Sequence, residues 1–563
     1  MPPPPPSLPP PPPPDADEDE ADVQDAEYWT RLAQSSSSSS APGPSISQPA
    51  HTSNAVAKKG KQSALYLDTI NRAVLDFDFE KLCSVSLSNI NVYACLVCGR
   101  YFQGRGRNSY AYLHSIDESH HVFLNLASAQ TYILPDNYAV PDENQAALAD
   151  IKYLLNPTFS RKTIETLDGM TAYDLNGERY YPGFVGLNNV GKTDYVNAVV
   201  QALVHVPAVR DYFLEARETQ GEARSELVKR FGALVRKMWN PRAFKPQVSP
   251  HEFLQQVAQV SGNRFRITHQ ADPVEFLGWL LNRLHADLSS SSHAGGAKGG
   301  KRKRGAGGGE SVISRCFQGT VRVESQPLAR RDDPEASASS VAAEAEHMLN
   351  NGGSAASGGQ IDDDGRIRFD PAVAMEKRDS PFFLLAMDLP TPPPVLGEEE
   401  EHLVPQVTIG QVLAKYDGRS LHESNGKLTR YQLRRLPPFL IVHFRRFTKN
   451  SLGEEERNPT LVNFPIKGLD VTKHAPLLPD AQAPQPSQSL AEVYDLVANV
   501  VYDAVPGTVR QGASWKCQVH TTGKGKEAEK WFGIQDLLVE EVNRQMIFLG
   551  ESYLQIWAKR SSS

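Results

Sequence analysis

A glycine-rich turn that runs directly into a helix, residues 183–207 (GFVGLNNVGKTDYVNAVVQALVHVP), most constrains how this chain can fold. The part after the turn has the i, i+3, i+4, i+7 apolar spacing of one buried helical face, made by Val196, Val199, Val200 and Leu203. Thr193 or Asp194 is predicted to be the N-cap, where a side-chain oxygen accepts a hydrogen bond from a backbone N–H. The Asp194 carboxylate should then lie at the positive end of the helix dipole, which favours its ionised form.

Residues 186–193 (GLNNVGKT) also satisfy the phosphate-loop pattern G-x-x-x-x-G-K-[ST]. The segment Leu384–Asp388 (LLAMD) has the composition of the metal-binding strand that such an enzyme requires. A phosphate loop follows a buried strand, and the preceding residues 180–183 (YYPG) are a poor candidate for one. A nucleotide-binding enzyme is therefore the minor alternative for this stretch.

The same turn and helix resemble the nucleophile box of the ubiquitin-specific proteases. The match runs through Gly186, Leu187, Asn189, Gly191, Thr193, Tyr195 and Asn197. In that family the residue between the threonine and the tyrosine is the catalytic cysteine, and this chain has Asp194 there. The family's asparagine that helps to form the oxyanion hole corresponds to Asn189.

Two later segments resemble further boxes of the family. Residues 270–288 are predicted to form a helix whose core-facing stripe is Leu277, Leu280, Leu281 and Leu284. Residues 436–447 (LPPFLIVHFRRF) are predicted to form a strand that buries Leu440, Val442 and Phe444. Strand patterns are also expected at residues 314–325 and 381–390.

An active protease of this family needs an imidazole to deprotonate the thiol and a carboxylate or amide to orient the imidazole. The family's histidine aligns with Ser514, and its orienting residue aligns with Gln535. A shifted alignment brings His520 nearer, but the thiol is still missing. The resemblance thus implies a protease fold that is not an enzyme, with degenerate catalytic positions at Asn189, Asp194, Ser514 and Gln535.

Cysteine and histidine spacing predicts a zinc site ahead of the protease-like segment. Cys95-x-x-Cys98 is followed by His114 and His120, which together supply two thiolates and two imidazoles for a tetrahedral ion. A closed site of four ligands contributes folding energy and leaves no position for water chemistry. His121 is the main competitor for the last ligand position.

The residues around this site resemble the UBP-type zinc finger that accompanies many ubiquitin-specific proteases. Several of those fingers carry an additional cysteine site, which is eroded here because Ser86 and Gln103 stand where cysteines are usual, beside Cys83. The resemblance implies one structural zinc ion and a finger that serves as a docking module.

Charge and cysteine usage set further limits. The chain has 563 residues, a net charge of −7 and five cysteines, which favours a reducing compartment over a secreted disulfide scaffold. The negative charge argues against nucleic-acid binding over the whole surface. We see no signal peptide and no membrane-spanning apolar stretch, so we expect a soluble intracellular protein. A basic run at residues 298–304 (KGGKRKR) is typical of a solvated loop or of a nuclear-import signal.

We predict three regions along the chain. Residues 1–63 form a Pro-, acidic- and Ser-rich tail that is expected to be disordered. Residues 64–165 form a small α+β zinc-finger domain, and residues 171–560 form an α+β, papain-like domain with the ubiquitin-specific-protease fold. Low-complexity insertions are expected near residues 289–310, 326–364, 391–405 and 472–489.

Within the family, the finger, the nucleophile box and the C-terminal segment ESYLQIW most resemble a non-catalytic branch whose members associate with the spliceosomal tri-snRNP. This resemblance implies a nuclear assembly factor that holds the tri-snRNP together for pre-mRNA splicing through contacts with its proteins, with no membrane and no evident nucleic-acid site. A deubiquitinase that uses other residues, and a domain that still binds ubiquitin or a ubiquitin-like fold, stay open as alternatives.

Overall fold

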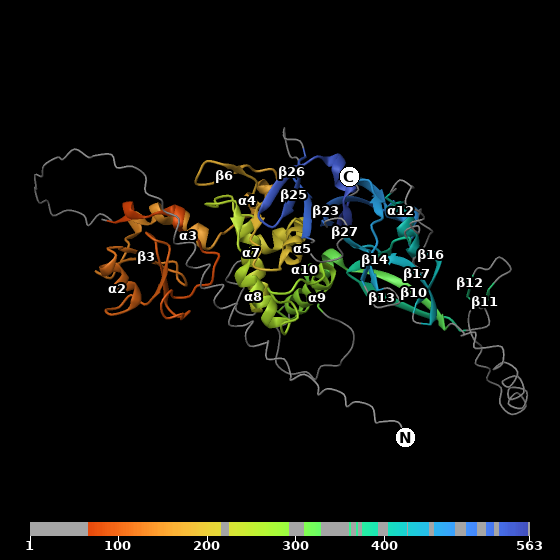
Figure 1. Cartoon of the computed structure of the whole chain (residues 1–563), viewed down its shortest axis with the longest axis horizontal. Coiled ribbons are helices and arrows are strands. Elements are labelled where there is room, and N and C mark those ends of the chain that lie inside the picture. Colours follow the sequence, from red (N-terminus) through yellow and green to blue (C-terminus); the bar gives the residue numbers. More distant parts are fainter. Residues whose placement is uncertain are drawn as a thin grey trace, which may run out of the picture. The chain divides into compact units, whose positions relative to one another are not determined.

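A computed structural model describes residues 66–215, 224–291, 309–327, 360–361, 367–369, 374–391, 404–424, 426–449, 455–478, 491–503, 514–522 and 529–560. The predicted tail 1–63, the basic run at 298–304 and most of the predicted insertions lie outside these residues. The finger and the protease-like region belong to one compact unit, Ala64–Ser563 (Figure 1). Among the described helices, none combines the length and the apolar character needed to cross a bilayer.

The finger is a small antiparallel sheet with one helix, α2 (Tyr110–Asp117). Its five strands run in the order β2-β1-β3-β4-β5. Their bounds are β1 Val92–Cys95, β2 Tyr101–Gln103, β3 Val122–Asn125, β4 Thr131–Ile133 and β5 Tyr138–Ala139. Short turns of 3₁₀ helix flank the sheet at η1 Leu67–Thr69, η2 Arg72–Val74 and η3 Asp142–Leu148, and α3 (Ala149–Leu155) ends this part. One core of buried apolar side chains joins residues from Leu75 to Leu155.

Helices form the first layer of the protease-like region. Their bounds are α4 Arg161–Leu167, α5 Asp194–Val204, α6 Pro207–Glu215, α7 Glu226–Met238, α8 His251–Val260, α9 Pro273–Ser291 and α10 Val312–Phe317. Two short strand pairs lie among them, β6 Ala172–Tyr173 with β7 Arg179–Tyr180, and β8 Gly186–Leu187 with β9 Gln247–Val248. The predicted leucine stripe of α9 is confirmed, because all four of its leucines are fully buried.

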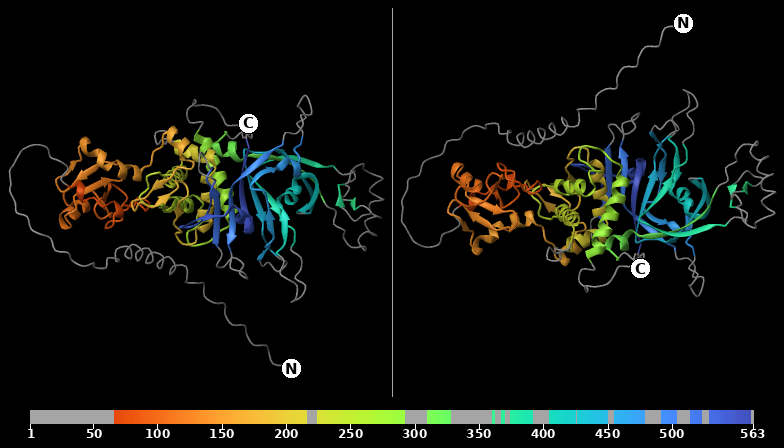
Figure 2. Two further views of the ribbon diagram at one scale, coloured as in Figure 1. Left: turned by 90° about the horizontal axis from the view of Figure 1, so that it is seen from above. Right: turned by 90° about the horizontal axis from the view of Figure 1, so that it is seen from below.

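Helix α5 lies between strand β24 of the large sheet and helix α9. The apolar stripe predicted one buried face, yet every residue of α5 is buried. Strands β23, β24 and β25 of the large sheet contact α5, and helices α6 and α9 contact it as well. Figure 2 shows in two views that the helices pack beside this sheet. Tyr195 and Phe276 meet edge to face across the contact with α9.

The main sheet follows the order β14-β18-β27-β23-β24-β25-β26, and β22 pairs with β23. Its bounds are β14 Leu384–Asp388, β18 Phe439–Arg445, β22 Lys467–Asp470, β23 Val493–Asp503, β24 Ser514–His520, β25 Trp531–Gln535, β26 Leu538–Val542 and β27 Glu551–Lys559. Strands β14 and β18 are parallel, and the other pairs are antiparallel. The predicted inward face of β18 is confirmed, since Leu440, Val442 and Phe444 are buried.

A second sheet has four strands in the order β13-β10-β17-β16. Its bounds are β10 Gly319–Pro327, β13 Glu376–Phe382, β16 Asp417–Ser424 and β17 Lys427–Arg435. The remaining short elements are β11 Gln360–Ile361, β12 Ile367–Arg368, β15 Gln406–Thr408, α12 Ile409–Leu413, η5 Ala414–Tyr416, β19 Phe447–Lys449, β20 Glu455–Arg457, β21 Leu461–Asn463, α13 Val471–His474 and η6 Arg544–Leu549.

The predicted strand at residues 314–325 is partly wrong. The first residues form helix α10, whose start is fixed by a capping box in which Ser311 and Ser314 each accept from the other's backbone N–H. The insertion predicted at 472–489 also begins too early, because α13 occupies Val471–His474.

Replacing Trp557 with alanine should lower the free energy of unfolding by about 3–5 kcal/mol. This indole is fully buried on β27, donates from Nε1 to Gln555 Oε1 at 3.1 Å, and meets Phe464 edge to face. Urea denaturation measures the change. Leu549→Ala, at a half-exposed side chain, should cost less than about 1 kcal/mol and serves as the control. Equal losses for the two variants would contradict the assignment of Trp557 to the core.

Candidate functional site

Asp194, the residue predicted to stand at the degenerate nucleophile position, lies at the start of α5. Thr193 is the N-cap and Asp194 the first helical residue, but no side-chain cap bond forms, because the Thr193 hydroxyl accepts from the backbone N–H of Val190 instead. The Asp194 carboxylate is buried. It accepts from Gln270 Nε2 at 2.9 and 3.1 Å and from the Trp515 backbone N–H at 3.2 Å.

The other two degenerate positions are next to it. Ser514 begins β24 and is the chain neighbour of Trp515, whose N–H bonds to Asp194. Gln535, at the end of β25, donates from Nε2 to Ser514 Oγ at 2.5 Å. The structure therefore brings Asp194, Ser514 and Gln535 together at one end of two neighbouring strands and the N-terminus of α5.

Asn189 joins this site through a carboxylate that the sequence analysis did not single out. Its Oδ1 accepts from the Thr193 N–H at 3.0 Å, and its Nδ2 donates to Asp536 Oδ2 at 2.9 Å. Asp536 also accepts from Asn197 Nδ2 at 2.8 Å, and its carbonyl accepts from the Leu187 N–H. Asp536 thus ties the turn after β25 to the glycine-rich turn and to α5. Its place directly after Gln535 in the matched motif was the available signal.

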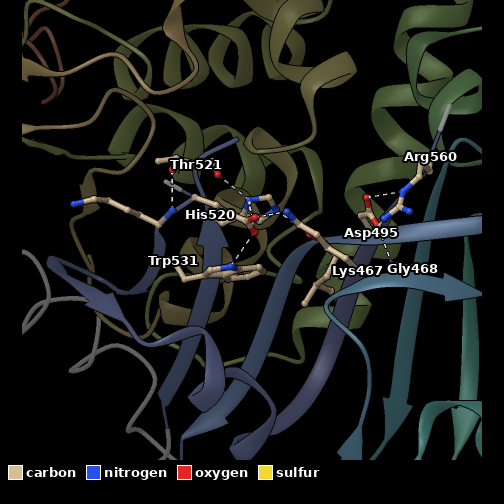
Figure 3. Close-up of polar contacts among 10 residues, drawn as sticks. Lys467, Gly468, Asp495, His520, Thr521, Trp531 and Arg560 are labelled. Atoms are coloured by element: carbon tan, nitrogen blue, oxygen red, sulfur yellow. Dashed lines mark hydrogen bonds and ion pairs between the residues drawn. The ribbon is translucent and has the colours of Figure 1, made fainter. Parts of the chain in front are cut away.

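His520 lies at the other end of β24, so the shifted alignment does not bring it to the site. His520 is six residue steps along the strand from Ser514, which corresponds to roughly 20 Å. Its Nδ1 is 3.0 Å from the Thr521 carbonyl oxygen and its Nε2 is 2.9 Å from that of Leu496, and its ring lies beside Trp531 (Figure 3). His520 is thus part of a polar cluster that includes Glu529.

The expectation that Asp194 favours its ionised form is wrong. Burial is the larger cause and the charge of nearby Asp536 the second, and together they raise the pKa of the carboxyl group to about 6. The hydrogen bonds from the Tyr195 and Trp515 backbone N–H groups act in the opposite direction without compensating. The helix dipole is worth less here than the loss of water around the charge.

Replacing Asp194 with asparagine should remove a pH dependence of stability. A raised native pKa means that proton binding stabilises the folded state below the ordinary value of 3.8, and that this contribution is lost as the pH rises through about 6. The free energy of unfolding of Asp194→Asn, relative to that of the unmodified chain, should therefore rise by about 2–3 kcal/mol between pH 4 and pH 7.5. Denaturant unfolding at the two pH values measures it.

The matched control for this prediction is Asp503→Asn, which changes an exposed carboxylate at the end of β23. Its difference from the unmodified chain should stay the same at both pH values. An Asp194→Asn difference that is equally flat would contradict a raised pKa at Asp194.

The glycine-rich turn does not have the surroundings of a phosphate loop. The first two residues of the pattern form β8, which pairs with β9, and the four residues before it, 182–185, form no strand of the main sheet. The LLAMD segment is β14, and its Asp388 is paired with Lys415 and Arg445. The two structural features that a nucleotide-binding enzyme would need here, a buried strand before the loop and an unpaired acidic residue on the LLAMD strand, are therefore not met.

The four predicted zinc ligands lie together in the finger. The ligand atoms of Cys95, Cys98, His114 and His120 all lie within 4.8 Å of one another. Cys95 ends β1, His114 is on α2, and Phe102 of β2 stacks on the His114 ring. Two sulfur and two nitrogen donors at this separation fit a tetrahedral zinc ion.

His121 and Cys83 lie outside this cluster. His121 Nδ1 is 2.8 Å from the Leu134 carbonyl oxygen, and its ring lies 4.2 Å from the Tyr66 ring at a tilt of 42°. At the eroded site, the Ser86 hydroxyl donates to Gln103 Oε1 at 2.8 Å, and the Ser86 N–H points at Cys83 Sγ at 3.4 Å. A hydrogen-bonded side-chain pair thus occupies the position at which related fingers hold more cysteines.

Comparison with known protein families matches both parts of the chain. The family described as ubiquitin carboxyl-terminal hydrolase matches residues 185–557, and the zinc finger of ubiquitin hydrolases and other proteins matches residues 83–145. The chain therefore belongs to the ubiquitin carboxyl-terminal hydrolase family, with the α+β ubiquitin-specific-protease fold and an N-terminal zinc finger.

Two similar proteins and one solved structure are informative. Ubiquitin carboxyl-terminal hydrolase 39 of Homo sapiens is 43% identical over 511 residues, which cover 88% of this chain and 80% of that protein. Pre-mRNA-splicing factor SAD1 of Saccharomyces cerevisiae is 30% identical over 514 residues, covering 89% and 95%. The crystal structure of an essential yeast splicing factor matches with a TM-score of 0.64 and 29% identity, covering 88% of this chain and 100% of that chain.

Proposed function

We propose that this chain is a non-catalytic assembly factor of the spliceosomal tri-snRNP, which works in the nucleus through contacts with other proteins. The observation that carries the non-catalytic part is the carboxylate of Asp194 at the N-terminus of α5, where the family has a thiol. The splicing part is supported by the names of the relatives, which include a pre-mRNA-splicing factor and an essential yeast splicing factor.

The chemistry around Asp194 supports a structural role. Both carboxylate oxygens are engaged by the Gln270 amide, and one also accepts from the Trp515 N–H. A nucleophile needs a neighbouring base that takes up its proton. Here the aligned base position is a serine whose hydroxyl accepts from Gln535, so it offers no imidazole. The carboxylate instead joins the start of α5 to β24 and to the segment before α9.

We also propose that the finger holds one structural zinc ion through Cys95, Cys98, His114 and His120. Their mutual closeness supports this assignment. Zinc held by four protein ligands contributes to folding rather than to catalysis.

A nuclear extract depleted of this chain tests the proposed function. Added purified chain should restore tri-snRNP assembly, seen by gradient sedimentation, and splicing of a reporter transcript. The double variant Asp194→Ala/Ser514→Ala should restore both equally well, because neither side chain performs chemistry. Affinity purification from the same extract should recover tri-snRNP proteins.

Two results would contradict the proposal. A folded chain that neither associates with spliceosomal particles nor restores assembly would refute the splicing role. Loss of splicing in the double variant, with particle association and unfolding temperature unchanged, would point to an activity at this site.

A further inference from the structure

The segment 75–80 (LDFDFE) alternates apolar and acidic side chains. In extended chain, successive side chains point to opposite sides. Leu75 and Phe77 are 4% and 2% exposed and belong to the core of the finger. The acidic side chains between and after them turn the other way, toward α7, β9 and α8 of the protease-like region. We call residues 75–80 the clamp.

Asp78 makes the most buried contact of the clamp. Its Oδ1 lies 3.0 Å from Lys237 Nζ, with side-chain exposures of 12% and 14%. Its Oδ2 accepts from the Ser249 backbone N–H at 3.1 Å. Lys237, on α7, also donates to the Phe77 carbonyl oxygen at 2.8 Å. One lysine thus bonds to both the side chain and the backbone of the clamp.

The two flanking carboxylates make further contacts with the same face. Asp76 pairs with Lys245. Glu80 Oε1 is 3.3 Å from His251 Nε2 and also accepts from Gln255 on α8. These side chains are more exposed than the Asp78–Lys237 pair, so each should contribute less. Together, three acidic residues of the finger meet four basic or amide-bearing side chains of the protease-like region.

We propose that the clamp is a docking interface that holds the finger on the α7–β9–α8 face of the protease-like region without help from the covalent link. The finger and the protease-like region then move as one body and present a single composite surface to their partners. Leu75 and Phe77 tie the clamp to the finger core, and its acidic side chains tie it to a basic surface, whereas Phe79 is 47% exposed. Breaking a nearly buried ion pair leaves a charge without its partner, so the central contact should dominate.

Cutting the connection between the two parts tests the clamp in the full chain. A recognition site for a specific protease is inserted after Thr158, which is exposed in the connection between α3 and α4. After cleavage, the finger fragment should remain bound to the rest of the chain in size-exclusion chromatography. The triple variant Asp76→Lys/Asp78→Lys/Glu80→Lys should release the fragment, with affinity reduced roughly 100-fold or more.

Matched variants separate docking from folding. Asp117→Lys makes one acid-to-lysine substitution of the same kind at an exposed position of α2 and should keep the fragment bound. Asp78→Asn and Lys237→Met should each weaken binding, and their combination should cost less than the sum, because both remove the same contact. Hydrogen exchange in β1 and β3 should be unchanged in every variant.

Three results would overturn the proposal. The cleaved, unmodified chain could dissociate freely; the triple variant could stay bound with unchanged affinity; or Asp117→Lys could release the fragment as strongly as the triple variant. The triple variant could itself unfold the finger, which would appear as faster hydrogen exchange in β1 and β3. In that case the pair Asp78→Asn and Lys237→Met decides: a combined cost below the sum supports the docking contact, and a fully additive cost contradicts it.

Discussion

Replacing Cys98 with serine should abolish zinc binding and unfold the finger. The other three ligands cannot complete a tetrahedral site of two thiolates and two imidazoles. Structural zinc in finger peptides is worth about 10–16 kcal/mol of apparent binding free energy, which exceeds what a small sheet core supplies by itself. Elemental analysis should fall from one zinc per chain to none, and hydrogen exchange should accelerate throughout β1–β4.

A cysteine and a histidine outside the ligand cluster provide the controls for this prediction. Cys83→Ser changes a buried cysteine outside the cluster, and His121→Ala changes a histidine that faces the Leu134 carbonyl. Both variants should keep one zinc. Retention of a full zinc equivalent by Cys98→Ser, or its loss in Cys83→Ser, would show that the ligand set is wrong.

The unmodified chain should not hydrolyse a fluorogenic amide of the ubiquitin C-terminus. In a serine protease, loss of the nucleophile or of its histidine alone lowers the turnover number by about 10⁶-fold. The family resemblance predicts that Asp194 and Ser514 stand at these two positions, so the rate should equal that of the buffer blank. An active ubiquitin-specific protease at the same concentration provides the positive control.

Single substitutions at the site should leave this result unchanged. Asp194→Ala should give the blank rate, since there is no activity to lose. Asp194→Cys should also be inactive, because Ser514 supplies no base and Gln270 and the Trp515 N–H would lose their carboxylate acceptor. Turnover by the unmodified chain that disappears in Asp194→Ala would establish a different mechanism.

Local sequence patterns predicted the helices and strands that are determined by residues within the same segment. The heptad-like leucines of α9 and the alternation in β18 identify their buried faces because helix and strand periods differ. Ligand spacing likewise identified the cluster of Cys95, Cys98, His114 and His120. Residues 314–317 were assigned to a strand because the decisive signal, the Ser311–Ser314 capping box, precedes a run that is apolar enough for either element.

Features that depend on distant parts of the chain were missed. The pKa of Asp194 follows from burial by β24 and α9, and no property of residues 186–204 reveals that burial. The alternation of apolar and acidic residues at 75–80 is visible in the sequence, but Lys237 and Ser249, which contact Asp78, lie far along the chain. The family resemblance predicts which positions are degenerate, and only the folded chain shows the contact between Asp194 and the backbone of Trp515.

Every residue of helix α5 is buried. Its amide hydrogens should therefore exchange with solvent only when the surrounding layers separate, at a rate set by opening of the whole domain. The start of α5, where Asp194 lies, would then be among the slowest-exchanging parts of the fold. Such a helix acts as a rigid joint between the helical layer and the large sheet.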